Sequence, residues 1–558
     1  MQNNNDPDLF VKSLSFNDGT VLSLNSSDII IFTGPNNSGK SRAIKDIYDY
    51  YRNNREPQIV VKDIQLDYSG SLTIDYVRRF YIWNGNAFYY ENHGIYDLQQ
   101  VVEEWDRHQL RLSGKFFVDY LTTEERLQAA SSTESINPLK QYPSKPLQSL
   151  IRHDSIERRL SELFEIAFGE RLCLDRGLGS QIALVIGTDV TPREGEDRVS
   201  ESFLSRLSEM PTVDIQGDGI RSFVGILLHL LSSDKSVTLI DEPEAFLHPT
   251  QARLLGEMIA KENKKQLFIT THSEDLLKGL IDNGGERVKI IRITREGAIN
   301  PIARLDNAQI RTIWKDPILK FSSLLSGLFH KKVIICEADT DCRFYQAIMN
   351  AIAEDMTIVR PDVLFTYSGG KERLKVMAGA LVPLKVPVAI VVDIDILDDL
   401  EKFKSLTDSI SIPWDDIQND WKMVYEYVKS QRPQLETAEV KKEVNRLLTP
   451  VTETLLPKQT ADSIRRVLKQ SSAWGKVKDA GKHYFRSESY NAFRRLDNQC
   501  RNYGLFIVPV GQLESFYPAI SSHGTQWVNS VLENNDLKKD KDLAEAREFV
   551  KDLVGLNS

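Results

Sequence analysis

The chain has 558 residues, 41% of them hydrophobic and 27% charged, and a formal net charge of −9. That length is too great for one hydrophobic core, so about two to four domains are expected. The negative balance excludes a polycation that coats nucleic acid nonspecifically, although it is compatible with local basic surfaces. Four scattered cysteines without a CxxC pair predict a reduced, cytoplasmic protein. The polar start and the lack of a long apolar run predict neither a signal peptide nor a membrane-spanning helix.

Strands alternate with helices in the first half of the chain, which predicts an α/β unit with a parallel sheet. A hairpin is indicated at 81–90, where an Asn-Gly pair separates two aromatic runs. Residues 95–170 are mostly helical in pattern, and the polar stretch 187–200 is predicted to be a loop. The other predicted elements are strands within 8–33, a helix at 40–51, a helix at about 219–232, a strand at 236–240, a helix after Pro249 and a strand at 266–270.

A second α/β unit begins near residue 330 and repeats the alternation of strands and helices. The charged, helical pattern of 398–500 contains no strong strand, so it indicates an insertion. The last 30 residues are predicted to form one charged helix. The predicted strands of this unit are 331–336, 363–368, 386–395 and 504–510, and a helix is expected at 341–353.

The clearest motif is GPNNSGKS at 34–41, which follows an apolar strand and opens a helix. It fits the P-loop pattern G-x-x-x-x-G-K-[ST], whose glycines let backbone N–H groups face phosphate. The lysine of this pattern reaches the β- and γ-phosphates, the serine hydroxyl reaches Mg²⁺, and the helix N-terminus adds positive partial charge. The motif therefore predicts ATP and Mg²⁺ binding by Gly34, Asn37, Ser38, Gly39, Lys40 and Ser41.

Two later strand ends carry residues suited to nucleotide hydrolysis. Asp241 ends the buried run VTLID and suits the magnesium shell, while Glu242 beside it suits positioning or deprotonating the attacking water. His272 follows the strand in LFITTHSEDLL. A histidine there is more often structural when it stands alone, but here it follows a P-loop and an Asp-Glu pair.

Together these motifs resemble the ABC ATPase class, in its soluble SMC/RecF-like branch. The resemblance implies that His272 senses the γ-phosphate and that QGDGIRSF at 216–223 occupies the signature-motif position, without the usual Leu-Ser-Gly-Gly-Gln text. Gly217 and Gly219 would give that segment a flexible helix start for holding a phosphate. In the ABC class the segment contacts the nucleotide of a second subunit, so a homodimer or a higher homo-oligomer is implied.

Acidic residues gather where three strands of the second unit end. In a parallel sheet the carboxyl ends meet at one edge, and carboxylates crowded there repel one another unless cations lie between them. Hard oxygen ligands suit Mg²⁺, Mn²⁺ or Ca²⁺ rather than zinc, and two such ions promote phosphodiester cleavage. Alternation along the strand is expected to put both aspartates of VVDIDIL on one face. The predicted metal ligands and catalytic residues are Glu337, Asp341, Asp393, Asp395 and Glu514.

The order E-x-x-x-D, then D-x-D, resembles the TOPRIM fold of topoisomerases, primases and some nucleases. YSGGKERL at 367–374 resembles the glycine-bearing segment between the two acidic motifs, and Ala338 stands where the family pattern has glycine. An ABC-class ATPase followed by a TOPRIM domain resembles, over nearly the whole chain, the OLD (overcoming lysogenisation defect) family of nucleases. That family includes the nuclease subunit of Gabija anti-phage defence and retron-associated effectors.

The OLD resemblance implies an ABC-class ATPase domain at 1–315, with an inserted helical and dimerisation region at about 95–200. It implies a TOPRIM nuclease domain at 316–558, with a helical insertion at about 398–500. The expected activity is two-metal cleavage of DNA, regulated by the ATPase domain. A helicase-like subunit or a retron RNA–DNA is an open choice of partner, and no membrane is expected. A family lysine that precedes the last glutamate corresponds to Lys478 or Lys482.

Residues 476–501 interleave basic and aromatic side chains. They predict either a surface that binds DNA through phosphate charge and base stacking, or an amphipathic helix with core aromatics. The alternative function for the whole protein is a non-cleaving, SMC/RecF-like DNA-binding or scaffold ATPase with a vestigial TOPRIM site. A topoisomerase would need a nucleophilic tyrosine in a dedicated domain, and the sequence offers no candidate for that domain.

Overall fold

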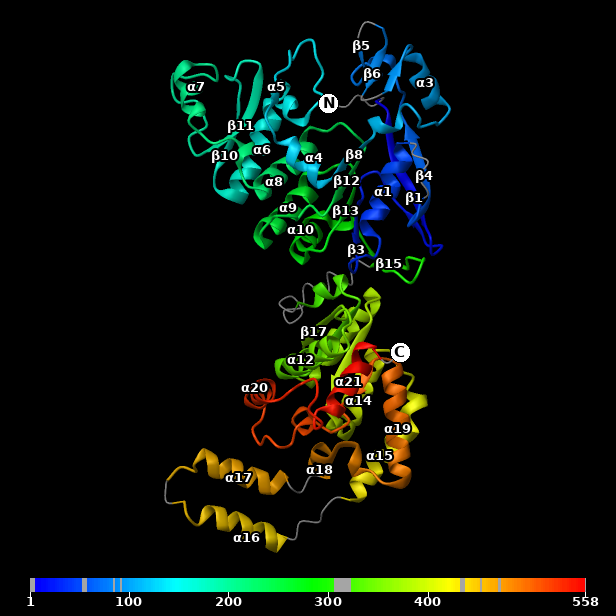
Figure 1. The fold of residues 1–558 in the computed structure, drawn as a ribbon, viewed down its shortest axis with the longest axis vertical. Coiled ribbons are helices and arrows are strands. Elements are labelled where there is room, and N and C mark those ends of the chain that lie inside the picture. The colour runs from blue at the N-terminus through cyan, green and yellow to red at the C-terminus, as the bar shows by residue number, and fades with distance from the viewer. Residues whose placement is uncertain are drawn as a thin grey trace. The chain divides into compact units, whose positions relative to one another are not determined.

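The computed structural model describes residues 6–52, 58–83, 86–90, 93–305, 323–431, 437–451, 454–469 and 473–556. The chain divides into two compact units, Met1–Thr312 and Ile313–Ser558, which are described separately (Figure 1). Within the described ranges, no helix has both the length and the apolar character needed to cross a membrane.

The first unit is built on a six-stranded sheet in the order β15-β14-β3-β13-β12-β8. Neighbouring strands from β14 to β8 run parallel, and β15 pairs antiparallel at the edge. The central strands β3 and β13 are buried along their whole length, as is typical of strands covered on both faces. The strands are β3 (Ile29–Thr33), β8 (Val118–Leu121), β12 (Val237–Asp241), β13 (Gln266–Thr270), β14 (Val288–Ile293) and β15 (Ile302–Leu305).

A small antiparallel sheet of β1 (Asp8–Phe16), β2 (Val21–Ser23) and β4 (Val61–Ser69) also belongs to the first unit. Helix α1 contacts β4 as well as β12 and β13, and one hydrophobic core includes residues of both sheets. The helices of this unit are α1 (Lys40–Tyr51), α2 (Ile74–Val77), α3 (Gln99–Asp106), α4 (Thr123–Ala129), α5 (Ser149–Arg152), α6 (Asp154–Phe168), α7 (Glu201–Ser208), α8 (Asp218–Ser232), α9 (Pro249–Glu262) and α10 (Glu274–Gly284).

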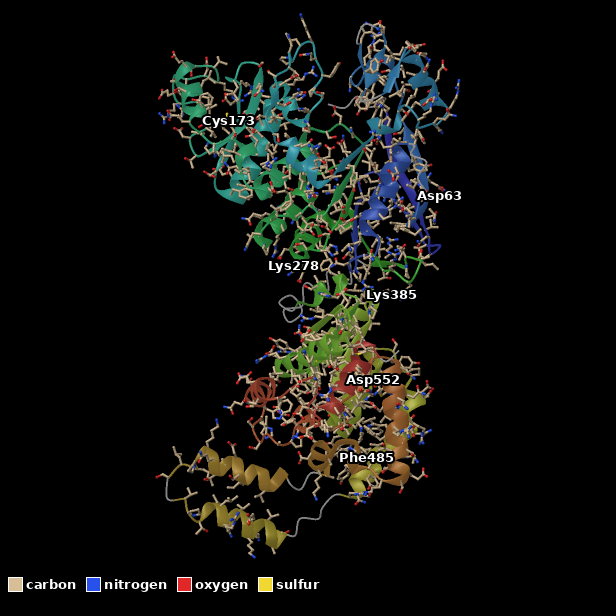
Figure 2. All side chains as sticks on the ribbon, viewed as in Figure 1. Asp63, Cys173, Lys278, Lys385, Phe485 and Asp552 are labelled. Atoms are coloured by element: carbon tan, nitrogen blue, oxygen red, sulfur yellow. The ribbon has the colours of Figure 1, made fainter. Side chains whose placement is uncertain are left out.

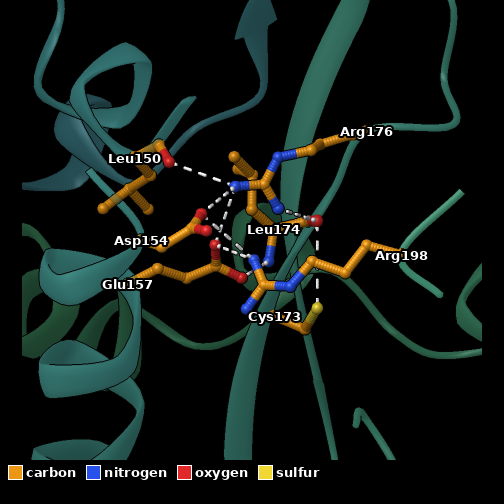
Figure 3. Close-up of polar contacts among 7 residues, drawn as sticks. All are labelled: Leu150, Asp154, Glu157, Cys173, Leu174, Arg176 and Arg198. Atoms are coloured by element: carbon orange, nitrogen blue, oxygen red, sulfur yellow. Dashed lines mark hydrogen bonds and ion pairs between the residues drawn. The ribbon is translucent and has the colours of Figure 1, made fainter. Parts of the chain in front are cut away.

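The region expected as a helical and dimerisation insertion at about 95–200 contains strands as well as helices. Strand β8 lies in this range and completes the main sheet, and β10 (Arg171–Asp175) pairs with β11 (Gln181–Gly187) beside β9 (Thr133–Glu134). The buried Glu157 of α6 accepts a hydrogen bond from the backbone N–H of Leu174 and forms ion pairs with two arginines (Figure 3). This network ties the β10–β11 hairpin to α6.

Several predicted local elements of the first unit are confirmed. The helix expected at 40–51 is α1, the helix expected at 219–232 is α8, and 188–200 is a loop. The predicted hairpin consists of β5 (Ile82–Trp83) and β6 (Phe88–Tyr90), and β6 pairs onward with β7 (His93–Ile95). Its Asn-Gly pair lies outside the described residues. The strands β14 and β15 were not predicted.

The second unit contains a four-stranded, all-parallel sheet in the order β17-β16-β18-β19. Helices α12, α20 and α21 share one hydrophobic core with three of these strands, while α13 packs against β16 and β18. All four strands therefore present their carboxyl ends at the same edge. The strands are β16 (Lys332–Cys336), β17 (Val363–Tyr367), β18 (Val388–Val392) and β19 (Leu505–Ile507).

Among the described residues, six α-helices lie between β18 and β19, and the described part of the final segment forms two helices rather than the single one predicted. The break falls at residues 535–543, where Asp536 and Asp540 accept backbone hydrogen bonds in turns. The helices of the second unit are α12 (Asp339–Asp355), α13 (Lys371–Leu381), α14 (Leu400–Ser409), α15 (Trp414–Ser430), α16 (Thr437–Leu448), α17 (Lys458–Lys469), α18 (Ala473–Ala480), α19 (Ser487–Asn502), α20 (Thr525–Asn534) and α21 (Ala544–Val554).

Candidate functional site

The first candidate site lies at the carboxyl edge of the six-stranded sheet, where β3 runs into the P-loop. Gly34 and Gly39 have φ values of 138° and 102°, in the region that favours glycine. A Cβ on Gly34 would fall 2.0 Å from the carbonyl oxygen of Ile293, so only glycine fits there. Asn37 also has a positive φ, 60°, which asparagine tolerates better than most residues. These residue types therefore suit the curled backbone of the loop.

The P-loop lysine is poised inside this curl. Lys40 is only 5% exposed, and its Nζ donates hydrogen bonds to the carbonyl oxygens of Gly34 at 3.0 Å and Pro35 at 2.8 Å. The hydroxyls of Thr33 and Ser38 are buried and find no hydrogen-bond partner among the described residues. A buried ammonium at the start of α1 beside unsatisfied hydroxyls fits a bound phosphate group.

The residues expected to serve Mg²⁺ and water lie beside the P-loop. The Oγ of Ser41 donates to Oδ1 of Asp241 at 3.0 Å, and the hydroxyl of Thr270 donates to the same oxygen. His272 Nε2 lies 3.4 Å from Oε1 of Glu242. These side chains lie close together because β12 pairs in parallel with β13, and β13 with β3, so the three strands end side by side. This hydroxyl and carboxylate pair is the donor set that Mg²⁺ takes in P-loop enzymes.

The signature-position segment also lies against the Asp-Glu segment. Gly217 is the N-cap of α8 and is surrounded by open space, while a Cβ on Gly219 would fall 2.7 Å from the carbonyl oxygen of Phe246. Gly219 thus permits a close approach between α8 and the turn that follows β12. A role for either glycine in binding a second subunit's nucleotide stays a prediction.

Two supporting residues were not predicted from the sequence. Arg126 of α4 is fully buried and donates to the carbonyl oxygens of Asp241 and Glu242 and to the hydroxyl of Ser222 in α8. Glu244 accepts hydrogen bonds from the Thr271 hydroxyl and the His272 backbone, each at 2.7 Å, and burial raises its pKa. Arg126 in EERL and Glu244 in DEPE are charged residues, and nothing in the sequence indicated that their side chains are buried.

The second candidate site lies at the carboxyl edge of the four-stranded sheet. Glu337 follows β16, and its Oε1 accepts the backbone N–H of Asp393, which follows β18, at 3.2 Å. Asp341 lies in the first turn of α12 and accepts the Ala338 N–H at 3.0 Å. Ala338 has φ −132°, an extended conformation that alanine adopts freely, so this position does not need the family's glycine.

Two lysines lie among these carboxylates. Lys478 of α18 has its Nζ 2.8 Å from Oδ2 of Asp393 and 3.6 Å from Oδ2 of Asp395. Lys371, at the start of α13, donates to Oδ1 of Asp395 and lies 4.0 Å from Oε1 of Glu337. These two ammonium groups therefore neutralise part of the carboxylate charge, for which the sequence predicted only metal ions. Lys371 was not predicted as a site residue.

The two lysine candidates are separated by the structure. Lys482 pairs with Glu545 of α21 at 2.5 Å, whereas Lys478 contacts the aspartates. Helix α18 ends at Ala480, and Gly481 turns the chain with a φ of 57°. Lys482 therefore does not share a helical face with Lys478.

Two geometric expectations for the acidic residues are wrong. Strand β18 ends at Val392, so Asp393 and Asp395 belong to a 3-10 turn (Ile394–Asp398) and its N-cap, and not to an alternating strand. Glu514 lies in a separate 3-10 turn beyond β19, where it accepts the N–H of Gly524 at 2.9 Å. Its charge still reaches Asp341, whose pKa it helps to raise.

Burial and mutual repulsion shift the proton affinities of the second site. Burial, with the charge of Asp393, raises the pKa of Glu337 to about 7. Burial also raises the pKa of Asp341 to about 6 and raises that of Asp393. Burial alone would lower the pKa of Lys478, but the hydrogen bond to Asp393 and the charges of Asp393, Asp395 and Glu337 together raise it. Such perturbed groups, gathered at a sheet edge, are typical of functional sites.

The donor chemistry fits a hard divalent cation, because the site offers carboxylate oxygens from two adjacent strand ends. Across the described ranges, however, no three His, Cys, Asp or Glu side chains are already grouped so as to hold a metal. The ammonium groups of Lys371 and Lys478 lie against these acids instead. The metal-ligand roles of Glu337, Asp341 and the other acids stay predictions.

The aromatic side chains of 476–501 are partly structural. Phe485, labelled in Figure 2, is buried and stacks on Phe493 with ring centroids 5.0 Å apart. Arg495 pairs with Asp420, and Arg501 pairs with Asp552. The structure thus favours the amphipathic-helix interpretation for these aromatic residues. Arg495 and Arg501 of this segment are already engaged in ion pairs with aspartates.

Comparison with known proteins bears on the first unit. Residues 202–278, which contain Asp241, Glu242 and His272, match a family model described as "AAA domain, putative AbiEii toxin, Type IV TA system". Among solved structures, the SmcHead bound to the C-winged helix domain of ScpA is 12% identical, with a TM-score of 0.34, over 54% of this chain and 99% of that one. The SMC head domain from Thermotoga maritima is 11% identical, with a TM-score of 0.30, over 55% and 100%.

A curated relative provides the family. Uncharacterized protein MJECL11 of Methanocaldococcus jannaschii is 32% identical over 87 residues, which make up 14% of this chain and 76% of that protein. The family-model match adds that the first unit contains a P-loop ATPase domain. Through the shared stretch, the chain belongs to the family of the Methanocaldococcus jannaschii protein MJECL11.

Proposed function

We propose that the protein is an ATP-binding and ATP-hydrolysing, divalent-metal-dependent DNA endonuclease that acts in prokaryotic anti-phage defence. The observation that carries the nuclease proposal is the meeting of Glu337, Asp393 and Asp395 with Lys478 at the carboxyl edge of an all-parallel sheet. That combination of hard ligands and one cation suits the cleavage of a phosphodiester.

The ATPase site has a residue for each task of phosphoryl transfer. Lys40 would bind the β- and γ-phosphates, and Ser41 with Asp241 would hold Mg²⁺. Glu242 would orient the attacking water, and His272, 3.4 Å away, would position Glu242 and contact the γ-phosphate. The resemblance to ABC-class and SMC/RecF-like ATPases supports a homodimer as the state that completes this site.

The nuclease site would hold Mg²⁺, Mn²⁺ or Ca²⁺ through Glu337, Asp341, Asp393, Asp395 and Glu514. The ions would supply a water nucleophile and stabilise negative charge on the leaving oxygen. Lys478 lies 2.8 Å from Asp393, and its charge partly offsets the rise that burial causes in the pKa of that carboxyl. Lys482 is not needed in this arrangement.

The defence role rests on resemblance rather than on geometry. The OLD-type order of an ATPase followed by a TOPRIM-like unit supports it, and the name of the matching family includes a toxin of a toxin–antitoxin system. A helicase-like subunit or a retron RNA–DNA is the kind of partner that the same resemblance supports.

A second candidate is a non-cleaving, SMC/RecF-like ATPase that binds DNA or serves as a scaffold. The observation that favours it is the neutralisation of Asp395 by two lysines without a preformed metal cluster among the described residues.

A plasmid nicking assay separates the two candidates. Purified protein is incubated with supercoiled DNA and Mg²⁺ or Mn²⁺, with and without ATP, alone and with proteins from neighbouring genes. The nuclease proposal predicts metal-dependent nicking that Glu337→Ala abolishes. Absence of such nicking under every condition would favour the scaffold.

A further inference from the structure

A hydrogen-bonded turn at Gly369 and Gly370 places Lys371 at the second site. The backbone N–H groups of Gly369 and Gly370 both donate to the carbonyl oxygen of Glu337, at 3.1 and 3.2 Å. These glycines have φ values of 71° and 136°, which other residues rarely adopt. The turn thus anchors the start of α13 to the backbone of the residue whose side chain Lys371 approaches.

The ammonium of Lys371 lies between acids from two different strands. It donates to Oδ1 of Asp395 and lies 4.0 Å from Oε1 of Glu337, and its own side chain is 26% exposed. Lys478 approaches the opposite oxygen of Asp395 and the carboxylate of Asp393. Lys371 is therefore the cation that bridges the acid after β16 to the acids after β18. A divalent ion shared by those acids would need the same space.

We propose that Lys371 is a built-in counterion that holds the carboxylates of the metal-free site together and must leave Asp395 when a divalent cation binds. This inference rests on the proposed nuclease site. Its physical basis is cation exchange: a divalent ion replaces the ammonium of Lys371 at the carboxylate oxygens of Asp395 and Glu337. The lysine stays protonated when its side chain leaves these oxygens. Metal affinity is thereby lowered by the cost of breaking the Lys371 contacts.

Isothermal titration of nucleotide-free, full-length protein with Mn²⁺ tests this exchange. Lys371→Ala and Lys371→Met, which keeps most of the side chain, are compared with the wild type. Loss of one partly buried ion pair predicts that the Kd for Mn²⁺ falls about tenfold. Lys402→Ala is the matched control, because Lys402 is 48% exposed and pairs with Glu372 at 3.1 Å, outside the acid cluster. Its Kd is expected to stay at the wild-type value.

Thermal stability gives a second readout. In EDTA the Lys371 variants are expected to melt below the wild type, and Mn²⁺ is expected to raise their Tm by more than it raises that of the wild type. Unchanged or weaker Mn²⁺ binding in both variants would overturn the counterion role. Wild-type protein that shows no Mn²⁺ binding sensitive to Glu337→Gln would instead refute the metal site itself, so the two failures are distinguishable.

Discussion

Replacing the P-loop lysine is the sharpest perturbation of the ATPase site. Lys40→Ala removes an ammonium that is 5% exposed and held by two loop carbonyls at 3.0 and 2.8 Å. With nucleotide bound, that group is expected to make two charged hydrogen bonds to phosphate oxygens, each contributing about 1.5–3 kcal/mol. A loss of about 3 kcal/mol or more from the transition state corresponds to a drop in kcat/KM of at least about 100-fold.

A phosphate-release assay over a range of ATP concentrations measures this loss. Lys45→Ala is the control, because Lys45 lies on the same helix α1 with its side chain exposed. It is expected to turn over ATP at close to the wild-type rate. Turnover by Lys40→Ala at the wild-type rate would refute the P-loop assignment.

Two further predictions concern the acidic site. Lys478→Ala is expected to reduce plasmid nicking at least about tenfold, because it removes a cation 2.8 Å from Asp393. Lys482→Ala, whose lysine pairs with Glu545, is expected to leave nicking unchanged. A loss of nicking in Lys482→Ala but not in Lys478→Ala would show that the wrong lysine was assigned. Because burial raises the pKa of Glu337 from 4.5 to about 7, the folded protein binds a proton that the unfolded chain releases in this range. In EDTA the free energy of unfolding is therefore expected to fall by about 1–3 kcal/mol as the pH rises through that window. Urea melts of Glu337→Gln are expected to lack this share of the pH dependence, and an equal slope in both proteins would contradict it.

Local patterns predicted the elements that carry the motifs. An apolar run before GPNNSGKS indicated β3, and the helix after it was correctly placed because Lys40 begins a segment with a strongly periodic apolar face. Strand β8 was missed since its four residues lie within a charged, helical stretch and are stabilised by pairing with β12, which is far away in the sequence. Such tertiary pairing overrides local propensity.

The composition of the acidic site was easier to predict than its geometry. Acids that follow apolar runs are visible in the sequence, but alternation along a strand does not place Asp393 and Asp395 because β18 stops at Val392. Lys478 and Lys482 are four residues apart, a spacing that would place both on one face of an unbroken helix. The turn at Gly481 separates them, and a Cβ there would fall 2.3 Å from the carbonyl oxygen of Pro509. That close approach depends on a distant segment, so spacing alone could not reveal it.

The most direct test of the account measures two activities in the same protein preparation. ATP turnover and Mn²⁺-dependent plasmid cleavage are measured side by side for wild-type protein and Glu337→Ala. The account predicts that Glu337→Ala loses cleavage and keeps the wild-type rate of ATP hydrolysis, because the acid lies in the second unit and the P-loop in the first. Cleavage by Glu337→Ala at the wild-type rate would contradict the assignment of the nuclease site.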